Sequence, residues 1–141
     1  NSGSHMFIAN GKKNNPISNM IENEKFTHFL PKVSSLDAKK KWIIGSLNSN
    51  GTIKIDDGAS KALLNGKSLL AAGVTKIDGF FNKGENVLIL DQNNNQLARG
   101  LSSFSSDEIN KIKGKQSKEI EKILGYLSKT EIIHKDDMVL L

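Results

Sequence analysis

The sequence predicts a small α+β domain, mainly β with short helices, and three observations support this class. Short apolar runs alternate with period two, turn dipeptides such as Asn-Gly separate them, and short helical stretches begin at Asp or Ser. With 141 residues the chain is long enough for about one domain. No apolar run approaches the roughly 20 residues of a membrane helix, so no membrane partner is expected.

The N-terminal segment differs from the rest of the chain. Residues 1–6 end in Gly-Ser-His-Met and are interpreted as an expression-tag scar. Runs at 7–9 and 26–30 predict two short strands, and Pro16 predicts the start of a helix between them. Such a unit is too small to bury its own faces. Residues 7–31 are therefore expected to be the trailing end of a larger domain.

A polar, lysine-rich linker is expected over 32–41, and the main domain over 42–141. Turn signals and apolar periodicity divide the main domain into five to seven short strands and several helices. The expected order is a hairpin of 42–47 with 52–56, a helix over 57–64 capped by Asp57, a strand at 74–79, a hairpin of 86–91 with 96–101, helices capped by Ser105 or Ser106 and by Ser117, and strands at 132–133 and 138–141.

The charge is concentrated near the N-terminus. The chain has 20 Lys+Arg against 15 Asp+Glu, a net charge of +5, and residues 1–41 supply +4 of it. A protein that neutralises phosphates needs basic side chains gathered on one surface, and the nearly neutral body does not indicate one. Arg99 is the only arginine, although arginine is the preferred residue for bidentate phosphate and base contacts.

Two motifs each allow two interpretations. Gly66-Lys67-Ser68 matches the end of a phosphate-binding loop, but Lys61 stands where that loop needs glycine, and the segment ends a helix instead of opening one. A helix-terminating turn is therefore favoured. His134 with Asp136 and its neighbour Asp137 supplies ligand types for a hard metal ion, but a solvated loop is favoured because no further ligands converge there. With no cysteine, a thiolate metal site and a thiol nucleophile are excluded.

Aromatic residues also allow two interpretations. Trp42 follows Lys39, Lys40 and Lys41, and an aromatic next to basic residues can form a stacking platform for single-stranded RNA. A core or interdomain anchor is the favoured alternative. Three phenylalanines are expected in the core or at its edge: Phe80, Phe81 and Phe104.

The sequence also resembles a known family, the C-terminal PUA domain of bacterial glutamate 5-kinase. The resemblance covers residues 7–141, and residues 7–31 resemble the last pieces of that family's amino-acid-kinase domain. The segments that carry it are FIANG (7–11), KWII (41–44), IDDGA (55–59), GKSLL (66–70), GFF (79–81), ARGL (98–101), SSDEI (105–109), IKGKQS (112–117), ILGY (123–126) and HKDD (134–137).

The resemblance implies a PUA-like pseudo-β-barrel and a non-catalytic fragment of a biosynthetic enzyme. No secretory signal is visible after residue 6, so a cytoplasmic location is expected. The parent would phosphorylate L-glutamate with Mg-ATP in proline biosynthesis and would be inhibited by proline. None of that family's catalytic motifs matches a position here, so no catalytic residue, cofactor site or metal site is expected in this chain.

Two functions remain open. The first is a regulatory or accessory domain whose partner is the kinase domain of the same parent chain. The second is an RNA-binding module for structured RNA, by analogy with PUA domains of other families. The candidate RNA contacts are Lys67, Ser68, Gly73, Lys39, Lys40 and Lys41.

Overall fold

The structure is a computed structural model that describes residues 3–12, 14–22, 25–45, 49–126 and 129–141. The chain divides into two compact units, Asn1–Lys39 and Lys40–Leu141, here called the first and second unit. No helix among the described residues is long and apolar enough to cross a membrane.

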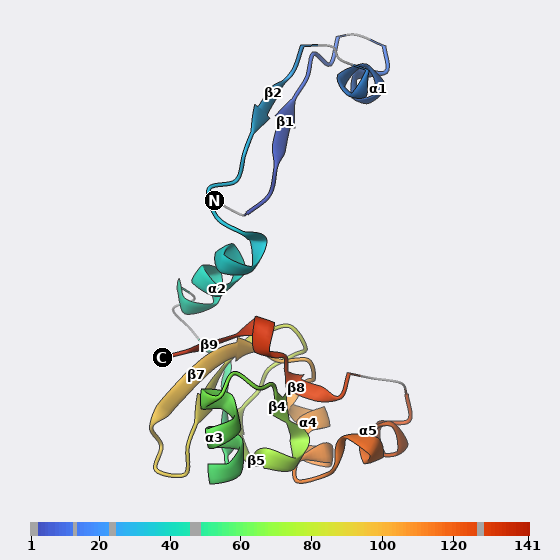
Figure 1. The fold of residues 1–141 in the computed structure, drawn as a ribbon. Coiled ribbons are helices and arrows are strands. Elements are labelled where there is room, and N and C mark those ends of the chain that lie inside the picture. Colours follow the sequence, from blue (N-terminus) through green and yellow to red (C-terminus); the bar gives the residue numbers. More distant parts are fainter. Residues whose placement is uncertain (1–2, 13, 23–24, 46–48, 127–128) are drawn as a thin grey trace. The chain divides into compact units, whose positions relative to one another are not determined.

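The first unit contains a two-stranded antiparallel sheet and one short helix (Figure 1). The strands are β1 (Met6–Ile8) and β2 (Thr27–Phe29), and the helix is α1 (Pro16–Ile21), which has proline at its start. The two strands and the helix predicted in this segment are confirmed. None of the described residues of the first unit is buried, so this part has no hydrophobic core.

Helix α2 (Ser35–Gly45) corrects one prediction and shows the secondary structure of most of the expected linker. Residues 35–41 of the expected linker are helical, and residues 42–45 continue the helix, so the strand predicted over 42–47 is wrong there; residues 46–47 lie outside the described residues. The Ser34 hydroxyl accepts a hydrogen bond from the backbone N–H of Asp37 (3.0 Å) and donates one to its carboxylate (2.8 Å). This Ser-x-x-Asp cap is a helix-start signal that outweighed the β preference of the Trp-Ile-Ile run.

The second unit is built on a five-stranded mixed sheet of order β5-β3-β6-β7-β9. β3 runs parallel to β6, and the other neighbouring pairs are antiparallel. The predicted pairing of 86–91 with 96–101 is confirmed, whereas the predicted hairpin of 42–47 with 52–56 is wrong because β3 pairs with β5 and β6. The strands are β3 (Gly51–Ile55), β5 (Val74–Gly79), β6 (Asn86–Leu90), β7 (Gln96–Leu101) and β9 (Met138–Leu140).

A small second sheet and short helices complete this unit. The expected α+β class is confirmed, and the described strands form an open sheet that does not close into a barrel. The second sheet pairs β4 (Leu69–Leu70) with β8 (Glu131–Ile133). The helices are α3 (Asp57–Leu64), α4 (Ser106–Ile112) and α5 (Ser117–Leu124), with 3-10 turns η1 (Ala71–Gly73) and η2 (Lys135–Asp137).

Two of the three predicted caps are displaced by one residue. The N-cap of α4 is Ser105, which forms a reciprocal capping box with Glu108, as the Ser-x-x-Glu spacing predicts. The N-cap of α3 is Asp56 instead of Asp57, and that of α5 is Gln116 instead of Ser117. Both displaced residues are the first residue of their helix, an error within the usual uncertainty of helix boundaries.

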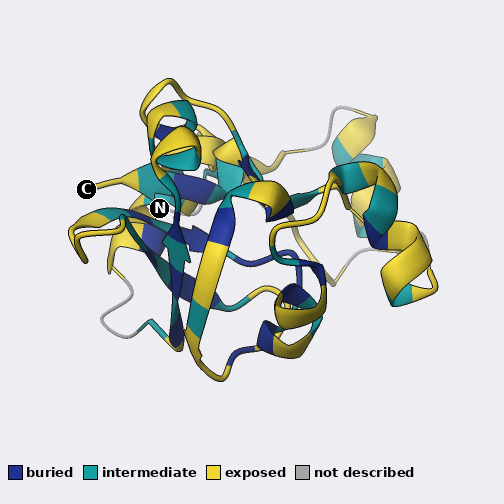
Figure 2. Ribbon diagram, turned by 90° about the horizontal axis from the view of Figure 1, so that it is seen from below, coloured by how far each residue is buried: buried dark blue, intermediate teal, exposed yellow. Residues whose placement is uncertain are grey.

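The core of the second unit lies between the large sheet and the helices (Figure 2). Phe81 and Phe104 have no exposed surface, as predicted, and they pack with isoleucines of β3, β6 and α4. Phe80, in contrast, is 70% exposed, and Trp42 is 59% exposed. The interpretation of Trp42 as a core residue is therefore wrong, and Ile43 instead is the residue of α2 that is buried. The alternative of an interdomain anchor stays a prediction.

Candidate ligand-binding cleft

Helix α3 positions one wall of the candidate site, and hydrogen bonds define both of its ends. At its start, the Asp56 carboxylate accepts a hydrogen bond from Ala59 N–H (2.7 Å). At its end, Gly66 adopts φ +71° and donates to the Leu63 carbonyl (2.8 Å), while Lys67 N–H donates to the Ala62 carbonyl (3.0 Å). This pair of bonds is the Schellman arrangement, in which glycine is favoured because a side chain is strained at that φ.

The η1 turn positions the opposite wall. Its Ala71 carbonyl accepts a hydrogen bond from Gly114 N–H (2.7 Å), and its Gly73 carbonyl accepts one from Asp56 N–H (3.0 Å). A Cβ added to Gly73 would lie 2.4 Å from the Cβ of Ala59. Glycine at this position therefore allows η1 to approach α3 closely.

A cleft of about 570 Å³ lies between α3, β4 and η1. This volume is within the range of roughly 300–1,000 Å³ that is typical of small-ligand sites. Its walls are mostly small and apolar: Gly58, Ala59 and Ala62 come from α3, and Leu70 and Ala72 come from β4 and η1. The small side chains leave the space open.

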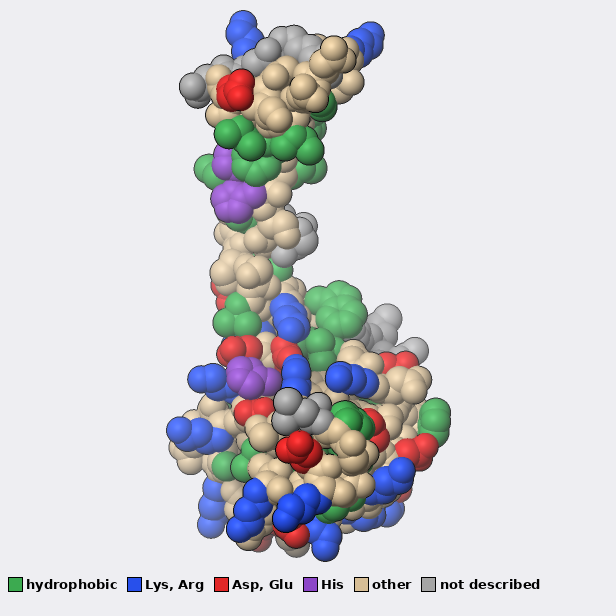
Figure 3. All heavy atoms as spheres, turned by 90° about the vertical axis from the view of Figure 1, so that its right-hand side faces the viewer, with side chains coloured by type: hydrophobic (Ala, Val, Ile, Leu, Met, Phe, Trp, Pro, Cys, Tyr) green, Lys and Arg blue, Asp and Glu red, His purple; other side chains and the backbone are tan. Residues whose placement is uncertain are grey.

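The charged residues at this cleft do not make it basic. Asp56 and Glu131 contribute two carboxylates, and Lys67 contributes one ammonium group. Glu131 is brought to the cleft by the β4–β8 sheet, where it is paired with Leu70. Within the part of the chain that the structure describes, neither Lys67 nor Glu131 forms an ion pair with another side chain. On the face seen in Figure 3, lysines of the second unit are likewise interspersed with acidic side chains.

Three of the six predicted contact residues line this cleft together: Lys67, Ser68 and Gly73. The structure also gives two of them local tasks. The Ser68 hydroxyl accepts a hydrogen bond from Lys135 N–H (3.1 Å), which joins the turn after α3 to η2. Gly73 provides the close approach to Ala59. The Lys67 side chain is the exposed cation of this group.

The other three predicted residues, Lys39–Lys41, lie on α2 and not at this cleft. Lys39 belongs to the first unit, and Lys40 and Lys41 belong to the second. Lys40 lines a separate groove of about 440 Å³ that also contains Gly66, the residue before Lys67 in the chain. Within the second unit, Lys40 and Lys41 therefore do not join Lys67 in lining this cleft.

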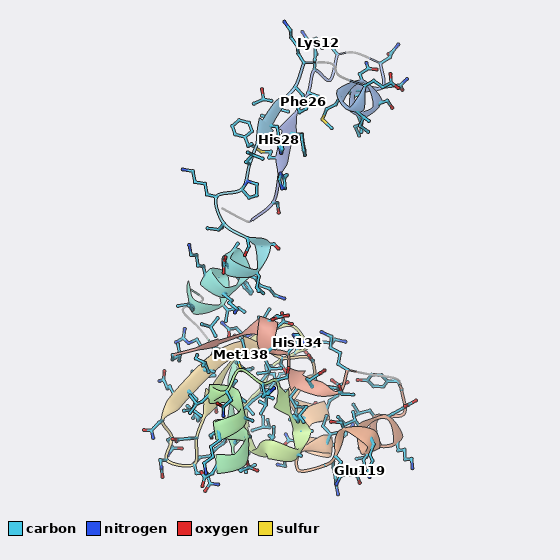
Figure 4. All side chains as sticks on the ribbon, in the orientation of Figure 1. Lys12, Phe26, His28, Glu119, His134 and Met138 are labelled. Carbon is cyan, nitrogen blue, oxygen red and sulfur yellow. The ribbon has the colours of Figure 1, made fainter. Side chains whose placement is uncertain are left out.

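The structure explains the two motifs that allowed two interpretations, Gly66-Lys67-Ser68 and His134 with its neighbouring aspartates. The backbone N–H groups of Gly66 and Lys67 are used by the Schellman turn, so the favoured interpretation of a helix-terminating turn is confirmed. His134 caps η2 by accepting a hydrogen bond from Asp136 N–H (3.3 Å) and lies between β8 and β9 (Figure 4). Among the described residues, no group of three or more His, Cys, Asp or Glu side chains is placed to hold a metal ion.

Sequence reasoning missed the two carboxylates that line the cleft, Asp56 and Glu131. Asp56 was assigned to the end of a strand, although an aspartate three residues before Ala59 carries a cap signal. Glu131 carried no local signal, because it reaches the cleft through its long-range pairing with Leu70.

Comparison with known proteins identifies the fold family. The model of the PUA domain family matches residues 51–124, a range from β3 through α5 that includes both walls of the cleft. The chain therefore belongs to the PUA domain family.

Similarity to curated proteins extends further along the chain. A glutamate 5-kinase from Pelagibacter ubique is 62% identical over 138 residues, covering 98% of this chain and 38% of the relative. A glutamate 5-kinase from Bartonella henselae is 46% identical over 138 residues, covering 98% of this chain and 36% of the relative. The chain thus spans little more than a third of these relatives. A solved PUA domain from Aeropyrum pernix K1 aligns with a TM-score of 0.47 and 15% identity, covering 92% of this chain and 85% of that chain.

Proposed function

We propose that this chain is the C-terminal accessory domain of a glutamate 5-kinase and that it regulates the kinase domain of the same parent chain. The observation that carries the proposal is the 62% identity to a glutamate 5-kinase over 98% of this chain, although the chain spans only 38% of that relative. The parent would transfer phosphate from Mg-ATP to L-glutamate in the cytoplasm, and this chain would supply no catalytic group.

The exposed apolar side chains of the first unit support a kinase-domain partner. Phe7, Ile8 and Phe29 on β1 and β2 are each about half exposed, and a two-stranded sheet is marginally stable by itself. Residues 7–31 are therefore proposed to be the trailing part of the kinase domain, which would cover these side chains.

The test compares the parent kinase with a form that lacks residues 46–141, a deletion that leaves α2 complete because the helix ends at Gly45. Glutamate-dependent phosphate transfer is measured at several proline concentrations. A shifted proline response with surviving activity is expected. Superimposed proline curves would contradict a regulatory role, and the absence of transfer in the intact parent would contradict the glutamate 5-kinase assignment itself.

RNA binding is the second candidate function, and one observation favours it. The cleft is lined by three residues that were proposed as contacts from the sequence, Lys67, Ser68 and Gly73. Lys40 and Gly66 line a second groove. The proposed ligand is structured RNA, with Lys39 and Lys41 contributing from α2.

This candidate is tested by titrating the chain with a structured RNA at two salt concentrations. Affinity should fall steeply with salt, and Lys67→Gln should reduce the slope of log affinity against log salt by about 1. Lys61→Gln is the matched control, because Lys61 is on α3 but does not line the cleft. Equal effects of the two substitutions, or no binding at low salt, would contradict RNA binding at this site.

A further inference from the structure

Strand β9 forms one edge of the large sheet, since β7 is its only partner strand among the described residues. One hydrogen bond shows which residues of this segment bond to β7: Leu141 N–H donates to the Leu97 carbonyl (3.0 Å). Backbone groups of successive residues in an antiparallel strand point to opposite sides. Those of Val139 therefore point toward β7, whereas those of Met138 and Leu140 point away from the sheet.

A groove of about 440 Å³ runs along this strand, and all three residues of β9 line it. Leu63 and Gly66 line it from the end of α3, and Leu63 has no exposed surface. Leu140 is 43% exposed. An unpaired strand edge and an apolar groove therefore occur at the same place.

The opposite edge of the sheet, β5, has a different surface. Lys76 and Asp78 of β5 form an exposed ion pair (2.8 Å), and the register is irregular between Lys54 and Ile55 of the neighbouring β3. Charged side chains and irregular pairing are the usual devices that keep an edge strand from pairing with other chains. The three residues of β9 are all apolar, so β9 itself has no charged side chain that would keep other strands from pairing with this edge.

The charges beside the groove indicate the kind of strand that would fit. Lys40 and Lys135 supply two positive charges, and Asp136 supplies one negative charge. We propose that the groove along β9 binds an extended acidic peptide segment of a partner protein, which pairs with the backbone of Met138 and Leu140 as an additional strand. An apolar side chain of the peptide would contact Leu140, which is 43% exposed, and the carboxylates of the peptide would face the two lysines.

The probe is a fluorescein-labelled peptide of sequence Glu-Val-Glu-Val-Glu with capped ends, titrated with the full chain and followed by anisotropy. Two further peptides carry N-methyl groups, one on both valine amides and one on the second and third glutamate amides. Only one set of amides can face β9, so one methylated peptide should bind about tenfold more weakly or worse, and the other should stay within about twofold. Equal binding of all three peptides, or no binding by the unmethylated one, would overturn the proposal.

A second arm changes the protein. Leu140→Pro removes an outward N–H and leaves the hydrogen bonds of Val139 to β7 in place, so it should weaken peptide binding about as much as the effective methylation does. Lys135→Glu should also weaken binding, while Lys76→Glu, at the opposite edge, should not. A thermal melt of each variant checks its fold. If Leu140→Pro does not fold, the comparison of the two methylated peptides decides the test.

The test also separates peptide binding from nucleic-acid binding. Bound peptide should slow amide exchange at Met138 and Leu140 more than at Val139, whose N–H already faces β7. If structured RNA displaces the peptide and both methylated peptides bind as well as the parent peptide, the lysines form a polyanion surface and the strand-addition proposal is wrong.

Discussion

The two units of this chain differ most in what happens to their apolar side chains. In the second unit, Phe81 and Phe104 are completely buried between sheet and helices. In the first unit, the ring of Phe7 stacks on His28 (4.1 Å between centroids) and contacts Phe26 (5.9 Å), yet Phe7 remains 47% exposed. The ring contacts of the first unit thus leave Phe7 half exposed to water, whereas packing in the second unit removes Phe81 and Phe104 from water completely. Burial is the larger source of stability.

The largest effect on stability is expected when a phenylalanine of each unit is replaced and the two losses are compared. Phe81→Ala should lower the free energy of unfolding of the second unit by about 3–5 kcal/mol, because it leaves a cavity in the core. Phe7→Ala should change it by less than about 0.5 kcal/mol. Urea unfolding followed by circular dichroism measures both, and equal losses would show that the contrast between the units is wrong.

A smaller effect is expected at the contact between α3 and η1. Gly73→Ala places a methyl group 2.4 Å from the Cβ of Ala59, so it should destabilise the second unit by about 1–3 kcal/mol. Gly45→Ala is the control, since nothing lies within 4 Å of its added Cβ. Thermal melts compare the two variants, and an unchanged melting temperature for Gly73→Ala would mean that η1 can move away from α3 at little cost.

The stability of the second unit is expected to depend on pH through the capping box formed by Ser105 and Glu108. Partial burial opposes ionisation of Glu108, but hydrogen bonds from Tyr126 and Ser105 outweigh it and lower the pKa of the carboxyl group. A lowered pKa in the folded state gives stability that is present above the ordinary glutamate pKa of about 4.3 and is lost as pH falls through the lowered value.

Glu108→Gln should therefore reduce the loss of stability between about pH 6 and pH 3. This range includes the pH values over which the Glu108 carboxyl group takes up its proton. The difference is expected to be about 1 kcal/mol or less, because water screens a partly exposed carboxylate. Urea unfolding at both pH values measures it. Glu121→Gln is the control, as Glu121 is exposed on α5, and an identical response of both variants would contradict a role for the capping box.

The smallest effect is expected from removing residues 1–32, which lie before the Ser34 cap of α2. Because no described residue of the first unit is buried, the unfolding free energy of the second unit should change by less than about 0.5 kcal/mol. A differential scanning calorimetry trace of the truncated and full chains decides this. A larger loss would show that the first unit contributes to the stability of the second.

Local signals predicted much of the fold. The helix starts near Asp56 and Ser105, the β6–β7 hairpin and the Gly66 turn were all predicted to within a residue, because each depends on neighbouring residues. The partner strands of β3 were not predicted, since its parallel pairing with β6 joins segments more than thirty residues apart. The helix over 42–45 was missed because apolar β-branched residues were weighted above the Ser34 cap.

For the candidate site, too, residues in local motifs were predicted and residues brought in by long-range pairing were not. Lys67, Ser68 and Gly73 were singled out from sequence, and the structure places all three at the cleft. The sequence did not show that Glu131 joins them, because that depends on the register of β8 against Leu70. The groove beside β9 was also beyond the sequence, which does not show that β9 is an edge strand.

The close approach of Gly73 to Ala59 has a consequence for how this domain can diverge. The two positions share one small space, so a larger side chain at either must be accompanied by a displacement of η1 from α3. Related domains that keep this cleft should therefore vary at the two positions together and remain small at both. Those in which the pair has enlarged should have a cleft of different width, and with it a different choice of ligand.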